Sequence, residues 1–282
     1  MSLFPAVRPS GDAFDAPNAP RTITDVTDHL TAPPPSAGDL PFAALEQGVA
    51  EVLARLRPLW EAPASLPVRS RVAPGDVRDQ LPSCAPVDGE TLRAILDDLD
   101  RIVLPGITHW NHPGFFAYFS ISSTIPSILA ELLMAGLDTN GMLWVTSPAA
   151  TELEQVVTRW LWDAMGLADG ATRFGMLTDT ASISTLLALA AAREATGFDV
   201  RGQGLAGRAL PALRTYCSAH AHSSIDKACL TLGLGHANVV KLPCDAEHRL
   251  RPDALAAAIA ADRAAGHHPM AIVATVGTTS TS

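Results

Sequence analysis

Three stretches of the sequence place hydroxyl or imidazole side chains directly after a predicted strand. They are Thr178–Ser182, Ser218–Ser224 with two histidines, and Gly277–Ser280. In open parallel α/β sheets, ligands bind beyond the carboxyl ends of the strands. Hydroxyls and backbone N–H groups at a helix N-terminus bind anions, and an imidazole can transfer protons near neutral pH. The three stretches are therefore the candidate parts of a ligand site.

Each stretch also has a purely structural interpretation. In the first stretch, Thr180 or Ser182 is then simply the N-cap of the following helix. In the third, Gly277–Ser280 is an ordinary hydroxyl-rich turn. His220 and His222 are spaced as a metal-binding pair could be, but no carboxylate or thiolate follows at ligand spacing. We therefore predict no metal site. On spacing alone, His222 is a polar residue near a helix start.

The elements that must position these residues alternate between strand and helix. Predicted strands are 174–178, 213–218, 239–242 and 271–276, and predicted helices are 182–196, 223–232 and 252–265. Repeated strand–helix units predict a parallel sheet with helices on both faces.

The preceding stretch, 109–166, gathers most of the aromatic residues, which make up only 5% of the chain: Trp110, Phe115, Phe116, Tyr118, Phe119, Trp144, Trp160 and Trp162. Several of them lie in predicted loops, where aromatic side chains more often line a pocket than fill a core. Two helices are predicted here. Ser123 is the expected N-cap of the helix 125–137, and Ser147 and Pro148 open a second helix that stops at Gly166.

The first part of the chain looks different. Residues 1–38 are rich in proline and are predicted to be flexible. Helices are predicted from Asp39 to about Trp60 and from Asp88 to Val103. Their apolar stripes are Phe42, Leu45, Val49, Val52, Leu53 and Leu56 in the first, and Leu92, Ile95, Leu96, Leu99 and Ile102 in the second. Two such helices joined by extended chain make a poor globule alone.

Composition limits the partners. With 282 residues, 48% of them hydrophobic, the chain can bury a sizeable core, and its net charge of −9 argues against nucleic-acid or anionic-membrane partners. We predict no signal peptide and no membrane span. Four cysteines without paired spacing suit a reducing cytoplasm.

Several motifs resemble the pyridoxal-phosphate-dependent (group II) amino acid decarboxylases, specifically the aromatic-L-amino-acid branch. They are THW, HPGFFAYFS, NGMLW and TSPAATELE, in that order, and the resemblance runs from about Val72 to the last residue. It implies an α/β fold of the PLP-dependent transferase type (fold type I, the aspartate aminotransferase fold), with a parallel-rich sheet and an N-terminal helical dimerisation segment. The implied cofactor is pyridoxal 5'-phosphate, and the implied partner is a second copy of the chain.

The resemblance also implies roles for individual residues. The turn with Thr180, Ala181 and Ser182 would hold the cofactor phosphate, although Asp179 stands where the family commonly has glycine. His222 would stack on the pyridine ring and handle protons near the substrate α-carbon. Thr279 would lie beside cofactor and substrate.

Substrate class follows from the same comparison. Trp110, Tyr118 and Phe119 match positions that line the substrate side-chain pocket, and Met142 matches one contributed across the dimer. Such a pocket suits an aromatic amino acid. Ser120 and Ile121 depart from the branch at positions usually held by proline and a small hydroxyl residue, so a catechol substrate is not supported.

Two expected parts are missing. The only lysines, Lys227 and Lys241, do not stand in the context of the Schiff-base lysine, and the Asp-Ala-Ala strand that pairs with the ring nitrogen is absent. The sequence therefore looks like an N-terminal portion: a flexible segment 1–38, a dimer-wrapping helical segment 39–124, and an incomplete cofactor-binding domain 125–282. Three interpretations stay open. They are a truncated or split decarboxylase needing a complementary C-terminal half, an aldehyde-forming or acidic-substrate variant, and a non-catalytic dimerising subunit.

Overall fold

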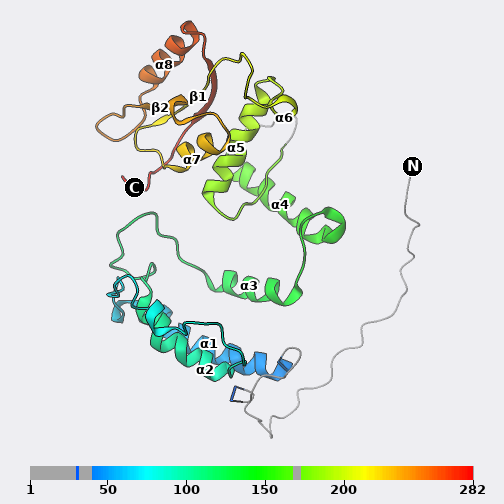
Figure 1. Cartoon of the computed structure of the whole chain (residues 1–282), viewed down its shortest axis with the longest axis vertical. Coiled ribbons are helices and arrows are strands. Elements are labelled where there is room, and N and C mark those ends of the chain that lie inside the picture. The colour runs from blue at the N-terminus through cyan, green and yellow to red at the C-terminus, as the bar shows by residue number, and fades with distance from the viewer. Residues whose placement is uncertain (1–29, 32–39, 168–172, 282) are drawn as a thin grey trace, which may run out of the picture. The chain divides into compact units, whose positions relative to one another are not determined.

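The computed structural model describes residues 30–31, 40–167 and 173–281 (Figure 1). The chain divides into two compact units, Met1–Phe115 and Phe116–Ser282. Most of the predicted flexible segment 1–38 lies outside the described residues. Of that segment, Leu30 is buried, and its carbonyl accepts a hydrogen bond from Arg93 N–H at 3.0 Å. The domain boundaries predicted from the sequence stay predictions.

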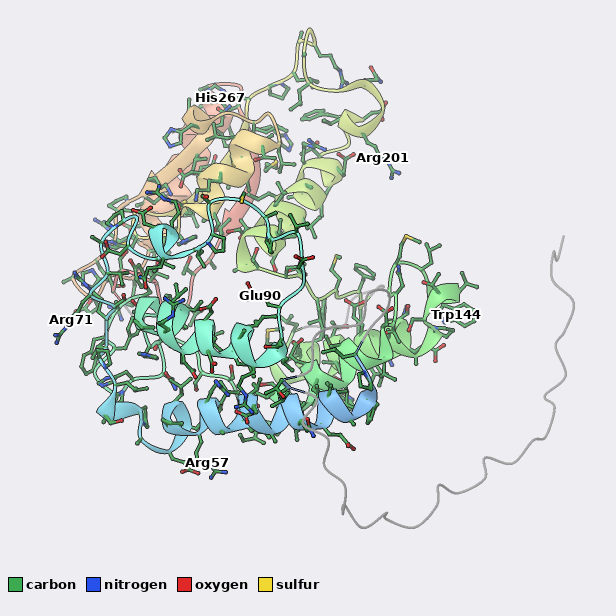
Figure 2. The ribbon with its side chains drawn as sticks, turned by 60° about the horizontal axis from the view of Figure 1, so that its bottom comes forward. Arg57, Arg71, Glu90, Trp144, Arg201 and His267 are labelled. Atoms are coloured by element: carbon green, nitrogen blue, oxygen red, sulfur yellow. The ribbon has the colours of Figure 1, made fainter. Side chains whose placement is uncertain are left out.

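In the first unit, α1 (Phe42–Glu61) follows Pro41 and lies against α2 (Leu92–Asp98). Its small residues face inward: Ala44 and Gly48 are buried, and a Cβ on Gly48 would come within 3.1 Å of Leu92. Arg55 completes the contact by donating to Asp100 at 2.9 Å. In Figure 2, Arg57 projects from the side of α1 that faces away from α2.

The predicted apolar stripe of α1 therefore does not face α2. Phe42 is 73% exposed and Leu53 is 53% exposed, whereas the buried positions are Ala44 and Gly48. The stripe of α2 is split, since Leu96 and Ile102 are buried but Ile95 is exposed. Within the described first unit, α1 thus leaves a largely apolar face open to solvent.

The second helix of the first unit begins later than predicted. α2 begins at Leu92 rather than Asp88, because the Thr91 hydroxyl caps it by accepting from Ala94 N–H at 3.2 Å. It continues as a π-helical turn over Leu99–Val103 and a 3₁₀ turn over Leu104–Gly106. The predicted cap Asp39 lies outside the described residues. Shorter 3₁₀ turns occur at Pro63–Ser65, Arg78–Gln80, Trp144–Thr146 and His236–Asn238.

The second unit opens with α3 (Ile125–Leu137) and α4 (Pro148–Ala164). Thr124, not Ser123, caps α3, and it exchanges hydrogen bonds with Ser127 as a capping box. Ser147 precedes α4 as predicted, but its side chain makes no capping hydrogen bond. Gly166, with φ +64°, provides the predicted stop after α4.

The second unit contains a three-stranded parallel sheet (Figure 1). β1 (Leu213–Ser218) lies between β2 (Val239–Leu242) and β3 (His268–Val273). The bounds of β1 and β2 match the prediction, whereas β3 begins and ends three residues earlier than predicted. Its pairing with β1, from Leu213↔His268 to Cys217↔Val273, sets these limits.

The predicted strand 174–178 was wrong: this segment is not a strand, and no described strand pairs with it. A strand needs a neighbour to satisfy its backbone groups. Here Leu177 N–H instead donates to the Glu154 carboxylate of α4 at 2.7 Å.

Helices cover both faces of the sheet, as predicted for a fold type I domain. They are α5 (Ala181–Ala195), α7 (Ser224–Thr231) and α8 (Pro252–Ala264), and the one-turn helix α6 (Val200–Gln203) follows α5. α5 and α7 bury one face in a cluster of Leu189, Leu213, Cys217, Ile225, Ala228, Cys229 and Leu234. On the other face, the fully buried Tyr216 donates its hydroxyl to Asp262 of α8 at 2.7 Å. Burial and this hydrogen bond both raise the pKa of Tyr216.

Asp226, in the first turn of α7, ties this helix to β2. Its Oδ2 accepts from Lys241 Nζ at 2.8 Å, while His236 Nε2 lies 3.2 Å from Oδ1, outside hydrogen-bonding geometry. Burial opposes ionisation of this carboxyl, but the hydrogen bond and charge of Lys241 prevail and hold its pKa below the ordinary 3.8. For Lys241, burial acts against the charged form, and Asp226 outweighs it, so its pKa is raised above 10.5.

We predict that Asp226→Asn lowers the free energy of unfolding by about 1–2 kcal/mol near neutral pH, since one charge-assisted bond is lost and Lys241 is left without its carboxylate. The pH dependence has a defined sign. Because folding lowers the pKa of the Asp226 carboxyl below 3.8, the carboxylate contributes its full stabilisation above pH 3.8. That contribution is lost as the pH falls through the pKa of Asp226 in the folded protein. Urea unfolding of a folded preparation checks this. A difference between variant and wild type that stays constant down to pH 2 contradicts it.

Candidate functional site

The carboxyl end of the sheet carries a cavity of about 260 Å³ between β1, β3 and the loop after β2. Its polar lining includes Ser218 at the end of β1, His248 of the loop, and Thr278 after β3. Ser218 and Thr278 are both buried. A cavity at this end agrees with the ligand position expected for parallel α/β sheets.

The N-terminus of α5 leaves backbone N–H groups without a partner among the described residues. Thr180 is its N-cap, and the Thr180 hydroxyl accepts from Ile183 N–H at 3.3 Å. Within the described structure, the N–H groups of Ala181 and Ser182 make no hydrogen bond, and both residues are exposed. Two free N–H groups at the positive end of a 15-residue helix can bind an anionic group.

Neighbouring hydroxyls order this turn. Thr178 Oγ1 and Ser184 Oγ are 2.5 Å apart, and Thr178 also donates to the Thr180 carbonyl at 3.2 Å. Asp179, beside the cap, is exposed. Its carboxylate favours the helix N-terminus but repels any anion bound there.

The loop after β1 carries both histidines. His222 is exposed, and its Nδ1 accepts from Ser224 N–H at 3.1 Å. A neutral imidazole whose Nδ1 accepts has its proton on Nε2. His220 makes a different contact: its ring meets that of His248 edge to face, with centroids 5.1 Å apart.

The turn after β3 orients two threonines differently. Thr278 is buried and is joined to Thr281 through their hydroxyls at 2.7 Å. Thr279, the residue predicted to touch the cofactor, is exposed and does not line the cavity. Nor do Thr180, Ala181, Ser182 and His222 line it. The sequence singles out the stretches that contain Ser218 and Thr278 but not His248, and the cofactor contacts of the predicted residues stay predictions.

The predicted substrate-pocket residues belong to both units. Trp110, in the first, stacks on Phe115 with ring centroids 4.9 Å apart. Tyr118, Phe119 and Met142, in the second, are exposed, and none lines a described cavity. Tyr118 has φ +58°, a left-handed conformation that is strained for an aromatic residue and is enriched at functional sites. The pocket itself stays a prediction.

No group of three or more histidine, cysteine, aspartate or glutamate side chains in the described parts of the chain could hold a metal ion. Among the described helices, none is long and apolar enough to cross a bilayer. The four cysteines are unpaired, and burial raises the thiol pKa of Cys217 and Cys229.

A parallel sheet covered on both faces, with free N–H groups at a helix N-terminus and a histidine-bearing loop, is typical of a ligand-binding α/β domain. Over residues 74–282 the chain matches the pyridoxal-dependent decarboxylase conserved domain, and it belongs to that family. The cofactor of the family is pyridoxal phosphate.

Curated relatives of the chain are named as decarboxylases of aromatic amino acids or as a phenylacetaldehyde synthase. Tyrosine decarboxylase 2 of Arabidopsis thaliana is 40% identical over 230 residues, covering 79% of this chain and 41% of that protein. Phenylacetaldehyde synthase of the same plant is 40% identical over 222 residues, covering 77% and 44%. Oryza sativa TDC, solved with PLP and tryptamine, has a TM-score of 0.77 at 32% identity and covers 86% of this chain and 53% of that one. The chain thus spans about half the length of these relatives, or less.

The described residues fit part of the cofactor. The free N–H groups of Ala181 and Ser182 fit its phosphate, and His222 is free to cover a flat ring from the next loop. Neither lysine fits the covalent attachment. Lys241 is held as an ammonium ion by Asp226, and Lys227 is exposed on α7.

Proposed function

We propose that this chain is the N-terminal part of a PLP-dependent decarboxylase that converts an aromatic L-amino acid to its amine and CO₂. The observation that carries the proposal is the unbonded helix N-terminus at Ala181 and Ser182, inside a chain that belongs to the decarboxylase family. When bound, pyridoxal phosphate supplies an electron sink for the electrons released as the carboxyl group leaves. The test is to combine the chain with a complementary C-terminal segment and measure CO₂ and amine from tyrosine, tryptophan and phenylalanine. Release from none of the three contradicts the proposal.

The phosphate would be held at α5. Thr180 keeps the helix start rigid, while Ala181 and Ser182 present their N–H groups to the anion. Thr279 would stand near the cofactor and substrate, as the family motif suggests.

Asp179→Gly is predicted to raise the affinity for pyridoxal phosphate roughly three- to tenfold, because a negative charge is removed beside the bound phosphate. Asp179→Asn, which keeps the side-chain size, should give a similar gain and serves as the matched control. Quenching of tryptophan fluorescence by the cofactor measures both. Unchanged or weaker binding in the two variants places the phosphate elsewhere.

His222 would cover the cofactor ring and hold a proton near the substrate α-carbon. The hydrogen bond from Ser224 N–H fixes Nδ1 as an acceptor, so the neutral ring presents Nε2–H outward. The backbone thus orients the imidazole before substrate arrives, which lowers the cost of ordering it during the reaction.

We predict that His222→Ala lowers kcat/KM of the complemented enzyme by about 100-fold or more, as expected for loss of a proton-handling group. His220→Ala is the matched control two residues away, and its loss should be no more than about tenfold. Steady-state amine production measures both. Equal and small losses would leave His222 as a polar residue at a helix start.

The substrate side chain is expected to meet Trp110, Tyr118 and Phe119, with Met142 contributed by a second copy of the chain. Apolar and aromatic linings select bulky apolar side chains over carboxylates. A preference for aspartate or glutamate in the same assay would overturn this assignment.

A second candidate is aldehyde formation, because phenylacetaldehyde synthase is as similar to this chain as tyrosine decarboxylase 2 is. The two candidates differ in product. Chromatography of the reaction with phenylalanine distinguishes the amine from the aldehyde.

The proposed partner is a second copy of the chain. The exposed stripe of α1, including Phe42 and Leu53, and the exposed apolar residues of α3, including Leu133 and Leu137, give it a surface to bury. Light scattering on the folded assembly measures its mass. A mass that corresponds to one copy contradicts this pairing.

A further inference from the structure

His248 is held in an unfavourable backbone conformation at the tip of a tight turn. Its φ is +61°, in the left-handed region that glycine adopts most readily. Asp245 builds the turn: its Oδ1 accepts from the N–H groups of Glu247 and Arg249 at 3.0 and 2.8 Å. The backbone closes it, since His248 N–H donates to the Asp245 carbonyl at 3.1 Å. Strain of this kind persists where the surrounding structure imposes it.

The imidazole of His248 packs against a residue of another loop, His220. Its ring meets that of His220 at a centroid distance of 5.1 Å and an interplanar angle of 90°, the edge-to-face arrangement that aromatic rings prefer. The charged neighbours of His248 are already paired, since Arg249 binds both Asp245 and Glu247 at 2.8 Å. The interaction that the structure shows for the His248 side chain is its contact with the His220 ring.

His220 lies in the middle of a short connection between β1 and α7. On one side, Ala219 N–H donates to the Leu242 carbonyl at 2.8 Å, which ties the start of the loop to β2. On the other side, two residues along, His222 Nδ1 accepts from Ser224 N–H at 3.1 Å. A displacement of His220 therefore moves the backbone that carries His222.

We propose that His248 is a positioning residue that acts through His220 and holds the loop on which His222 stands. This inference rests on the proposed function for the role of His222, but the contact itself does not depend on it. A glycine at residue 248 would relieve the backbone strain and yet release the loop. Local order and global stability therefore respond in opposite directions.

The test is hydrogen exchange at the Ser224 amide, which is protected while the His222 ring stays in place. The protein is used as the folded assembly with its complementary segment. His248→Gly and His248→Ala should each speed this exchange about tenfold, while the thermal midpoint of His248→Gly stays equal to that of wild type or rises. His248→Phe keeps an aromatic edge and should restore slow exchange.

The His220→Ala variant completes a cycle. If the two rings act together, the exchange rate of the double variant His220→Ala/His248→Ala equals that of either single variant. Unchanged exchange in His248→Gly, or faster exchange that His248→Phe fails to restore, overturns the proposal.

A second readout links the loop to the cofactor. The affinity for pyridoxal phosphate should fall roughly three- to tenfold in His248→Ala and recover in His248→Phe. If wild type binds no pyridoxal phosphate, the proposed function fails, while the exchange measurement still decides whether His248 holds the loop.

Discussion

The 282-residue chain, incubated with pyridoxal phosphate and an aromatic amino acid, is expected to release no CO₂ and to acquire no stoichiometric lysine label after borohydride reduction. Covalent attachment of the cofactor requires a neutral amine. Lys241 is the poorer candidate, because the Asp226 carboxylate at 2.8 Å raises its pKa and keeps it an ammonium ion. Lys227 is exposed on α7, where nothing in the described structure shields a covalent adduct from water.

Peptide mapping of the reduced protein provides the measurement, and Lys227→Arg and Lys241→Arg are the matched controls. Weak labelling that both controls leave unchanged is surface modification and agrees with the prediction. Labelling at one molar equivalent that disappears in one control, together with CO₂ release, shows that this chain carries its own catalytic lysine.

Local sequence signals were sufficient for much of the second unit. β1 and β2 have the predicted bounds, and α5, α7 and α8 end within one residue of theirs. Each of these elements is limited by features that lie in the local sequence, such as the Thr180 cap of α5 or Pro252 at the start of α8.

Elements whose limits depend on distant partners were predicted less well. β3 ends at Val273, where its pairing with β1 stops, although the apolar run continues to Val276. The segment 174–178 has an apolar sequence suited to a strand, but without a paired neighbour it stays irregular. α1 packs through Ala44 and Gly48 because small residues allow close approach to α2, which hydrophobic periodicity does not reveal.

In the candidate site, too, residues set by local sequence could be predicted, whereas those that depend on distant partners could not. Thr180 and His222 occupy a helix cap and a loop that the sequence places at the carboxyl edge of the sheet. Ser218 and Thr278 stand in stretches that the sequence singles out, but their meeting with His248 could not be predicted. The three residues come together only when β1, β3 and the loop after β2 are assembled.

The exposed apolar surface leads to the last expectation, which concerns stability. α3 has no described residue that is buried, and its exposed large side chains are Ile125, Leu129, Leu132, Leu133, Met134 and Leu137. Burying one such side chain is worth about 1.5–3 kcal/mol. Leaving several of these side chains exposed therefore forfeits a free energy comparable to the total stability of a domain, about 5–15 kcal/mol.

The sheet adds a second reason. With the order β2-β1-β3, β3 is an edge strand among the described residues. Ile272 within it is 54% exposed, and Val276 just after it is 98% exposed. Exposed apolar edge strands recruit other chains and lead to aggregation.

We therefore expect the chain produced alone to be aggregated or partly unfolded. Co-expression with the C-terminal segment that its longer relatives carry should make it soluble, by pairing β3 and covering the apolar helices. Size-exclusion chromatography and thermal unfolding followed by circular dichroism measure the outcome, with an unrelated α/β domain as the co-expression control. A monodisperse sample of this chain alone that unfolds in one sharp cooperative transition would contradict the expectation, because it would mean that these surfaces are already buried.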